Sequence, residues 1–158
     1  MTILGIDPGI GIVGYGLINA VRRRISPIAH GVITTPKENS VPSRLLEIRR
    51  DLCDIIEKFH PDAAAIEELF YKSNQKTVIP VAEARGVIVM TLEEHGIPIY
   101  EYTPLQAKMS LTGYGRAEKK QMMEMTRIRL GLESVPRPDD AADALAIALC
   151  HACTAGLG

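Results

Sequence analysis

The first nine residues contain a short apolar strand that ends on an acidic residue. Apolar and small residues alternate through residues 2–7, the last of these is Asp7, and Pro8 and Gly9 then force a turn. An aspartate at the end of a buried strand loses hydration, and either a turn hydrogen bond or a bound cation can offset that loss. A turn-forming aspartate is the simpler explanation, so the remaining sequence has to distinguish the two roles.

The hydropathy pattern predicts an α/β protein. Strands are expected at residues 2–7, 12–20, 28–35, 63–66 and 97–102, and helices at residues 43–60, 77–95, 104–111, 117–130 and 139–154. Short connections make the first three strands an antiparallel meander, whereas the long crossover through the first helix allows parallel pairing. We therefore expect a five-stranded mixed sheet, three antiparallel strands plus two parallel, flanked by helices. No linker or repeat interrupts residues 1–158, which predicts a single domain.

Four acidic residues are expected to meet at one edge of this sheet. Asp7 and Glu67 end strands that would be parallel neighbours, and Asp140 and Asp143 lie one turn apart at the start of the last helix. Asp140 alone could simply stabilise the positive end of its helix, but Asp143 lies among alanines, which indicate close packing. Carboxylates without His or Cys favour Mg²⁺ or Mn²⁺ over zinc. Two such ions would suit hydrolysis of a phosphodiester.

Composition narrows the class of protein further. The net charge of −1 does not exclude a nucleic-acid partner, because basic stretches at residues 22–24 and 108–129 offset acidic ones elsewhere. No apolar run approaches the roughly 20 residues of a membrane span, and the N-terminus does not resemble a signal peptide, so a cytoplasmic location is expected. Cys150 and Cys153 have CxxC spacing without a second pair, which favours buried thiols over a zinc or redox site.

A glycine-rich turn after a first strand also occurs in actin-like phosphotransferases, where it contacts nucleotide phosphates. Those folds need a second, similar domain, and 158 residues leave no room for one. A nucleotide-dependent phosphotransferase is therefore not expected.

Several sequence blocks together resemble the RuvC family of Holliday-junction resolvases. They are LGIDPG at residues 4–9, GYG at 14–16, AIEELF at 65–70, EARG at 83–86, AEK at 117–119 and DAADALAIA at 140–148. The blocks follow the family's order and cover nearly the whole chain. The resemblance implies an RNase H-like fold, a homodimer, and paired metal-dependent nicks in opposite strands of a four-way DNA junction. It also implies the RuvA–RuvB branch-migration complex as a partner.

The resemblance assigns roles to single residues as well. The family's acidic quartet falls on Asp7, Glu67, Asp140 and Asp143, its DNA-contacting lysines on Lys108 and Lys119, and its junction-facing aromatic on Phe70. Both lysines could instead be ordinary solvated helix residues, and Phe70 could instead pack on the first helix.

Arg116 and Lys120 flank an expected helix start that could bind phosphate, and both are candidate DNA contacts. Two features depart from the family pattern. Asp139 adds an acid beside the quartet, and the sequence reaches Gly158 without the basic tail that members often carry, which leaves tail-dependent DNA binding open.

We therefore expect a Mg²⁺-dependent endodeoxyribonuclease that resolves Holliday junctions in recombination and repair, with two ions per site and Mn²⁺ as a substitute. One alternative is an RNase H-like nuclease for another nucleic acid, because the fold does not dictate the substrate. The other is a catalytically silent junction-binding scaffold, which the intact quartet disfavours. The helix at residues 77–95 is unusually apolar around Val87 and Val89, and we expect it to form the dimer interface.

Overall fold

The computed structural model describes residues 1–68 and 75–157. Its strands are β1 (Thr2–Asp7), β2 (Ile12–Val21), β3 (Arg24–Thr34), β4 (Ala63–Glu67) and β5 (Ile99–Tyr102). Its helices are α1 (Val41–Phe59), α2 (Gln75–Glu94), α3 (Pro104–Thr112), α4 (Lys119–Leu130) and α5 (Asp139–Thr154). None of these helices is both long and apolar enough to cross a bilayer, among the residues described.

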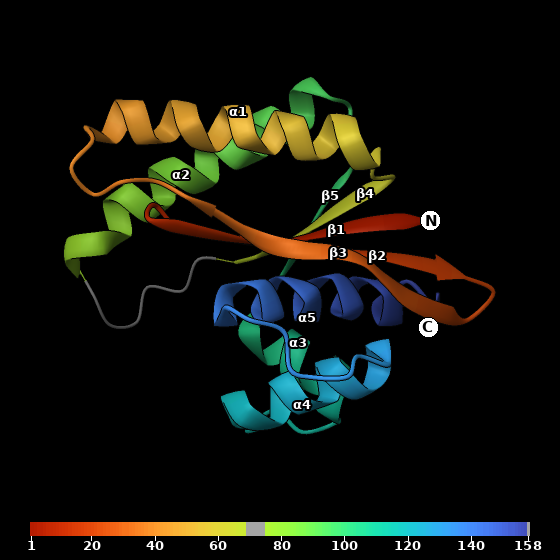
Figure 1. Cartoon of the computed structure of the whole chain (residues 1–158). Helices are drawn as coiled ribbons and strands as arrows, with labels where there is room; N and C mark the ends of the chain where they lie inside the picture. The colour runs from red at the N-terminus through yellow and green to blue at the C-terminus, as the bar shows by residue number, and fades with distance from the viewer. Residues whose placement is uncertain (69–74, 158) are drawn as a thin grey trace.

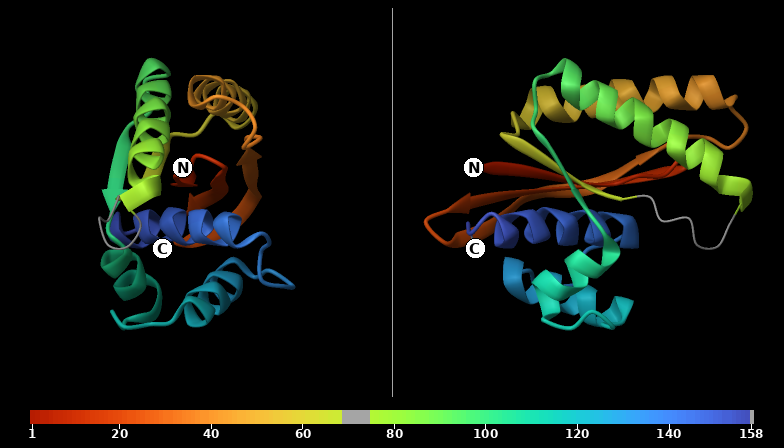
Figure 2. Two further views of the ribbon diagram at one scale, coloured as in Figure 1. Left: turned by 90° about the vertical axis from the view of Figure 1, so that its left-hand side faces the viewer. Right: turned by 180° about the vertical axis from the view of Figure 1, so that it is seen from behind.

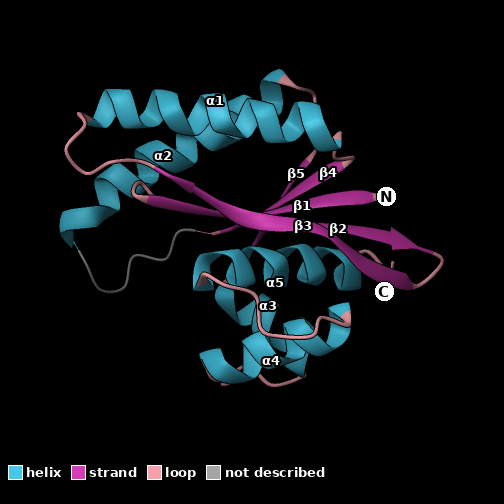
Figure 3. Cartoon of the chain, in the orientation of Figure 1, coloured by secondary structure: helices cyan, strands magenta, loops and turns pink. Residues whose placement is uncertain are grey.

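The strands form one sheet between two layers of helices (Figures 1 and 3). Helices α1 and α2 cover one face and α5 covers the other. Helices α3 and α4 pack on α5, on its side away from the sheet, as the two further views in Figure 2 make clear. The strand order is β3-β2-β1-β4-β5. This arrangement confirms the predicted five-stranded mixed sheet flanked by helices.

The register brings the ends of two central strands together. Strand β1 runs antiparallel to β2, with Gly5 opposite Gly16, and parallel to β4, with Ile6 opposite Ile66. Strand β5 continues the parallel half, with Glu67 opposite Tyr102. The carboxyl ends of β1, β4 and β5 therefore lie in one row at the same edge of the sheet.

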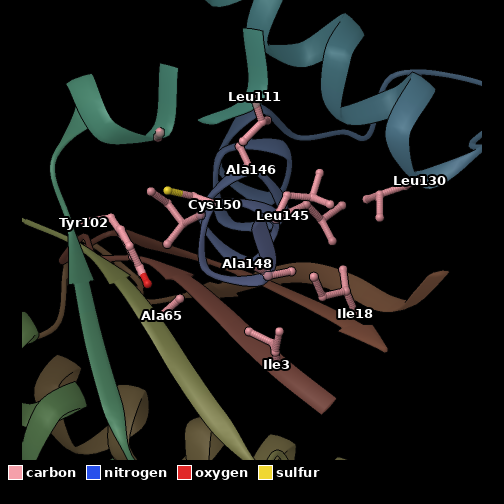
Figure 4. Packing of buried hydrophobic residues seen from close by; sticks show 14 of the residues in the cluster. Ile3, Ile18, Ala65, Tyr102, Leu111, Leu130, Leu145, Ala146, Ala148 and Cys150 are labelled. Carbon is pink, nitrogen blue, oxygen red and sulfur yellow. The ribbon is translucent and has the colours of Figure 1, made fainter. Parts of the chain in front are cut away.

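Alternate residues of β1 supply two separate cores. Ile3 points toward α5 and packs with Ile18, Ala65 and Leu145, as Figure 4 shows. Leu4 and Ile6 point the other way and pack under α1 and α2. Full burial of each such side chain contributes about 1.5–3 kcal/mol. Strand β1 is thus held from both faces, which fixes the position of the residue at its end.

Glycines let α5 lie unusually close to the sheet. A Cβ atom added at Gly5 would collide with the carbonyl oxygen of Ala144, and one added at Gly14 would collide with the carbonyl oxygen of Asp140. The helix is correspondingly rich in alanine, and Ala144 and Ala148 are fully buried. This contact between backbones places the first turn of α5 directly over the end of β1.

The third strand begins earlier than predicted, at Arg24 rather than at residue 28. Pro27 suggests a strand end because it lacks an N–H group, but β3 is an edge strand, where proline is tolerated. The register passes from Leu17 opposite Ala29 to Ile18 opposite Pro27, so Ile28 is the extra residue of a β-bulge.

Three helix starts also differ from the prediction, and α2 begins at Gln75 rather than at residue 77. Helix α1 begins at Val41 because the Ser40 side chain accepts a hydrogen bond from the Ser43 N–H. Helix α4 begins at Lys119, with Glu118 as its N-cap residue. The predicted start of α3 is confirmed, with Thr103 as N-cap residue and Pro104 in the first turn.

Helix α2 exposes other residues than those expected at a dimer interface. Val87 and Val89 are partly buried and pack against the core under α1 and α2, so only part of each side chain remains available to a second copy. Apolar side chains do reach solvent on this helix, but they are Ile79 and Met90, which are 68% and 47% exposed.

The three cysteines are free thiols. Cys150 is buried as predicted, whereas Cys153 is only half-buried and accepts a hydrogen bond from Arg129.

Candidate active site

Two acidic side chains lie next to each other at the carboxyl edge of the sheet. Asp7 is the last residue of β1 and Glu67 is the last residue of β4. Because Ile6 and Ile66 are register partners in parallel strands, the residues that follow them adjoin. Both side chains point to the face covered by α5, as Gly5 and Ala65 do two residues earlier. The predicted meeting of these two carboxyl groups is thus present.

Helix α5, which covers this face of the sheet, adds two further carboxyl groups. Asp140 and Asp143 lie one turn apart in its first two turns. The close contact of Gly14 with the Asp140 backbone fixes this end of the helix over β1 and β2. Pro138 is the N-cap residue of α5, so Asp139 lies in the first turn of the helix although an aspartate there could have been its cap.

Burial and neighbouring negative charges raise the pKa values of three of these carboxyl groups, those of Asp7, Glu67 and Asp143. Burial, followed by the negative charges of Glu67, Asp143 and Asp140, raises the pKa of Asp7 to about 8. Burial and the charge of Asp143 likewise raise the pKa of Glu67. Burial also raises the pKa of Asp143. Carboxyl groups crowded in this way require a cation or a proton to offset their charge.

Lys119 supplies part of that positive charge. Its Nζ lies 3.1 Å from Oδ2 of Asp143 and 3.6 Å from Oδ2 of Asp139. Asp139 also pairs with Arg137, at 2.7 Å. Asp139 therefore lies within a chain of surface ion pairs. The connection between Lys119 and Asp143 was not predicted, because 24 residues separate them.

The carboxylate oxygens of the four acids are of a type that suits a hard divalent cation, although they do not converge on a single position. Among the described residues, no group of three or more His, Cys, Asp and Glu side chains is arranged to hold a metal ion. Oxygen-only donors at the end of a rigid sheet are the ligand type that Mg²⁺ and Mn²⁺ take.

A cavity of about 180 Å³ opens beside the acids. Glu67, Asp143, Lys108 and Lys119 line it, together with apolar side chains of α3, α4 and α5. The two predicted DNA-contacting lysines thus lie beside two of the predicted acids. A cavity with both cations and carboxylates at its wall suits a phosphate group and the metal bound to it.

The other predicted DNA contacts lie elsewhere. Arg116 is exposed in the loop before α4, and Lys120 lines a separate hollow together with Tyr114. Phe70 lies outside the described residues. Tyr114 was not predicted as a functional residue, although an aromatic ring between Gly113 and Gly115 is a signal for an exposed, projecting side chain.

A mixed sheet with carboxylates at adjoining strand ends, completed by an acidic pair on the covering helix, defines a nuclease of the RNase H-like fold. Residues 3–151 match the family model for crossover junction endodeoxyribonuclease RuvC. The chain belongs to the RuvC family.

Individual relatives agree with this assignment. A crossover junction endodeoxyribonuclease RuvC from Syntrophomonas wolfei subsp. wolfei is 54% identical over 151 residues, which cover 96% of this chain and 88% of the relative. The structure of Thermus thermophilus RuvC matches with a TM-score of 0.92 at 35% identity, covering 100% of this chain and 97% of that one. T. thermophilus RuvC in complex with a Holliday junction substrate also matches, with a TM-score of 0.92 at 35% identity, covering 98% and 94%. The predicted RNase H-like fold and family are confirmed.

Proposed function

We propose that this protein resolves Holliday junctions by paired, Mg²⁺-dependent nicks in opposite DNA strands, during recombination and repair. The observation that carries the proposal is the meeting of Asp7, Glu67, Asp140 and Asp143 at one sheet edge in a chain of the RuvC family. These residues come from β1, β4 and α5, so the fold itself is what assembles them. We infer that residues 1–158 act as one nuclease domain, since both helical layers pack on the same sheet.

The same four carboxylates are the residues that would hold metal in this proposal. Two Mg²⁺ ions, or Mn²⁺ in their place, would polarise the phosphodiester and lower the pKa of an attacking water. Asp7 and Glu67 are fixed on strands, which limits how far their oxygens can move. Asp143 would exchange its contact with Lys119 for the metal, and the Lys119 ammonium would then be available to a DNA phosphate.

Positive side chains next to the acids would position the DNA. Lys108 and Lys119 line the cavity that Glu67 and Asp143 also line, so their ammonium groups are placed to contact the phosphate being cleaved. In our proposal Arg116 and Lys120 extend this contact along the backbone. By resemblance to the family, Phe70 would stack on a base at the junction centre.

Paired nicks call for two active sites, which a homodimer supplies with the two-fold symmetry of a junction. The exposed Ile79 and Met90 side chains support the outer face of α2 as the interface. A RuvA–RuvB complex would deliver the junction, again by resemblance to the family.

A substrate panel tests the proposed function. The protein is incubated with a synthetic four-way junction, a linear duplex of the same sequence and an RNA–DNA hybrid, each with Mg²⁺ or with EDTA. We expect paired nicks in opposite strands of the junction only, and only with Mg²⁺. Preferential cleavage of the hybrid would instead indicate a nuclease for another nucleic acid, and junction binding without any cleavage would indicate a scaffold.

A further inference from the structure

A second hollow, of about 460 Å³, lies between the loop after α3 and the first turns of α4. Its lining residues are Thr112, Tyr114, Ala117, Lys120, Gln121, Glu124 and Met125. None of them lines the cavity at the acids. The start of α4 nevertheless lies beside both the cavity at the acids and this hollow. Lys119 contacts Asp143, and the next residue, Lys120, lines the hollow.

The backbone holds Tyr114 in a fixed position. Its N–H donates a hydrogen bond to Oγ1 of Thr112 at 3.1 Å, and its carbonyl accepts one from the N–H of Ala117 at 3.1 Å. Gly113, with a φ of 70°, ends α3 in the left-handed conformation just before it. The tyrosine is nevertheless 56% exposed. Because these hydrogen bonds already hold the loop in one conformation, binding a ligand would cost little conformational entropy. The Tyr114 ring can therefore contact a ligand without a rearrangement of its backbone.

Glycine on the other side keeps the loop against α3. A Cβ atom added at Gly115 would lie 2.6 Å from Cδ1 of Leu105, so the Leu105 side chain, which is exposed, would have to move aside for a larger residue. Ala117 is almost completely buried and anchors the end of the loop. The exposure of Tyr114 therefore comes from a compact turn with buried ends.

Lys120 and Gln121 offer hydrogen-bond donors in the hollow, and the Tyr114 phenol can donate or accept. Oε1 of Gln121 accepts a hydrogen bond from the N–H of Glu118 at 2.8 Å, which leaves the amide nitrogen to donate elsewhere. The carboxylate of Glu124 is engaged by Arg127 at 2.6 Å. Lys120 makes no ion pair with any residue that the structure describes. An ammonium, an amide and a phenol beside apolar Met125 and Ala117 match a flat, acceptor-rich, anionic ligand.

We propose that this hollow binds one unpaired nucleotide of the junction DNA, with the base against Tyr114 and Met125 and its phosphate at Lys120. The inference rests on the proposed function and adds a contact outside the active site. A base exposes its face for stacking only when it leaves the duplex, so the hollow distinguishes a junction from linear DNA. A neutral or basic protein segment fits less well, because Glu124 is paired with Arg127 and the charge left available in the hollow is the positive charge of Lys120.

Binding to two DNA shapes tests the proposal. Fluorescence anisotropy gives the Kd for a labelled four-way junction and for a linear duplex, in EDTA and in an Asp7→Asn background that prevents cleavage. We expect Tyr114→Ala to weaken junction binding about tenfold and to leave duplex binding within about twofold. Tyr114→Phe, which keeps the ring, should bind both as the parent does. Lys120→Ala should weaken both and reduce the dependence of binding on salt.

Equal weakening of both DNA shapes by Tyr114→Ala, or no weakening of either, would overturn the proposal. Unchanged DNA binding with loss of RuvA–RuvB association would overturn it too, in favour of a protein-docking surface. A parent protein that does not prefer the junction contradicts the proposed function instead. A labelled single strand then tests the hollow alone: Tyr114→Ala should still weaken binding about tenfold, and unchanged binding would refute the hollow. The melting temperature of the Tyr114 variants should stay at that of their Asp7→Asn parent, since the ring is exposed.

Discussion

Asp7 is the residue at which the proposed function lowers the stability of the fold, because the active site needs a carboxylate where burial disfavours a charge. Its carboxyl group lies half-buried at the end of β1 beside three other acids, and burial, followed by their negative charges, raises its pKa to about 8. Ionising it costs folding free energy unless a cation is bound. Hydrophobic contacts on both faces of β1 offset this cost and keep the residue in place.

The pKa of Asp7 predicts how stability depends on pH in the absence of metal. Its folded-state pKa of about 8 lies above the usual aspartate pKa of 3.8, so between these pH values the folded protein holds a proton that the unfolded chain releases. This contribution to stability is complete below pH 3.8 and is lost as the pH rises through about 8. We expect the melting temperature in EDTA to fall over this range. The melting temperature of Asp7→Asn should depend less on pH and should exceed that of wild type at pH 8. Added Mg²⁺ should raise it less than it raises that of wild type. A wild-type melting temperature that rises with pH would contradict this prediction.

At the scale of elements, the contact between α5 and the sheet is what assembles the acidic quartet. Gly5→Ala would force a Cβ atom into the Ala144 carbonyl, so we expect it to lower the free energy of unfolding by about 3 kcal/mol and to reduce cleavage. Gly86→Ala on α2 is the matched control. A Cβ there meets nothing within 4 Å, and alanine should stabilise this helix by about 1 kcal/mol. Chemical denaturation measures both, and equal effects would show that α5 does not need the close approach.

Periodicity and turn residues were enough to predict all ten elements, and parallel pairing was enough to bring Asp7 next to Glu67. Local rules failed where a tertiary contact decides the outcome. Pro27 looks like a strand end until a bulge at an edge strand accommodates it. The contact of Lys119 with Asp143 depends on how α4 packs on α5, which no local pattern contains.

At the scale of the whole molecule, two nicks in opposite strands require two copies of the site. We expect the double variant Ile79→Glu, Met90→Glu to be monomeric in light scattering, because both side chains are exposed on the outer face of α2. Ile128→Glu on α4 is the control, since that side chain is 53% exposed on the opposite side of the sheet. A dimer that persists in the double variant would place the interface on another surface.

Mg²⁺-dependent cleavage of a four-way junction by Asp7→Asn is the measurement that tests the acidic quartet most directly. Wild type and Asp139→Asn are assayed beside it, because Asp139 is an acid of the same end of α5 whose contacts are Lys119 and Arg137. We predict that Asp7→Asn loses cleavage by about three orders of magnitude or more while still binding the junction. Asp139→Asn should stay within about tenfold of wild type. Cleavage by Asp7→Asn at a rate near that of wild type would contradict the assignment of the active site.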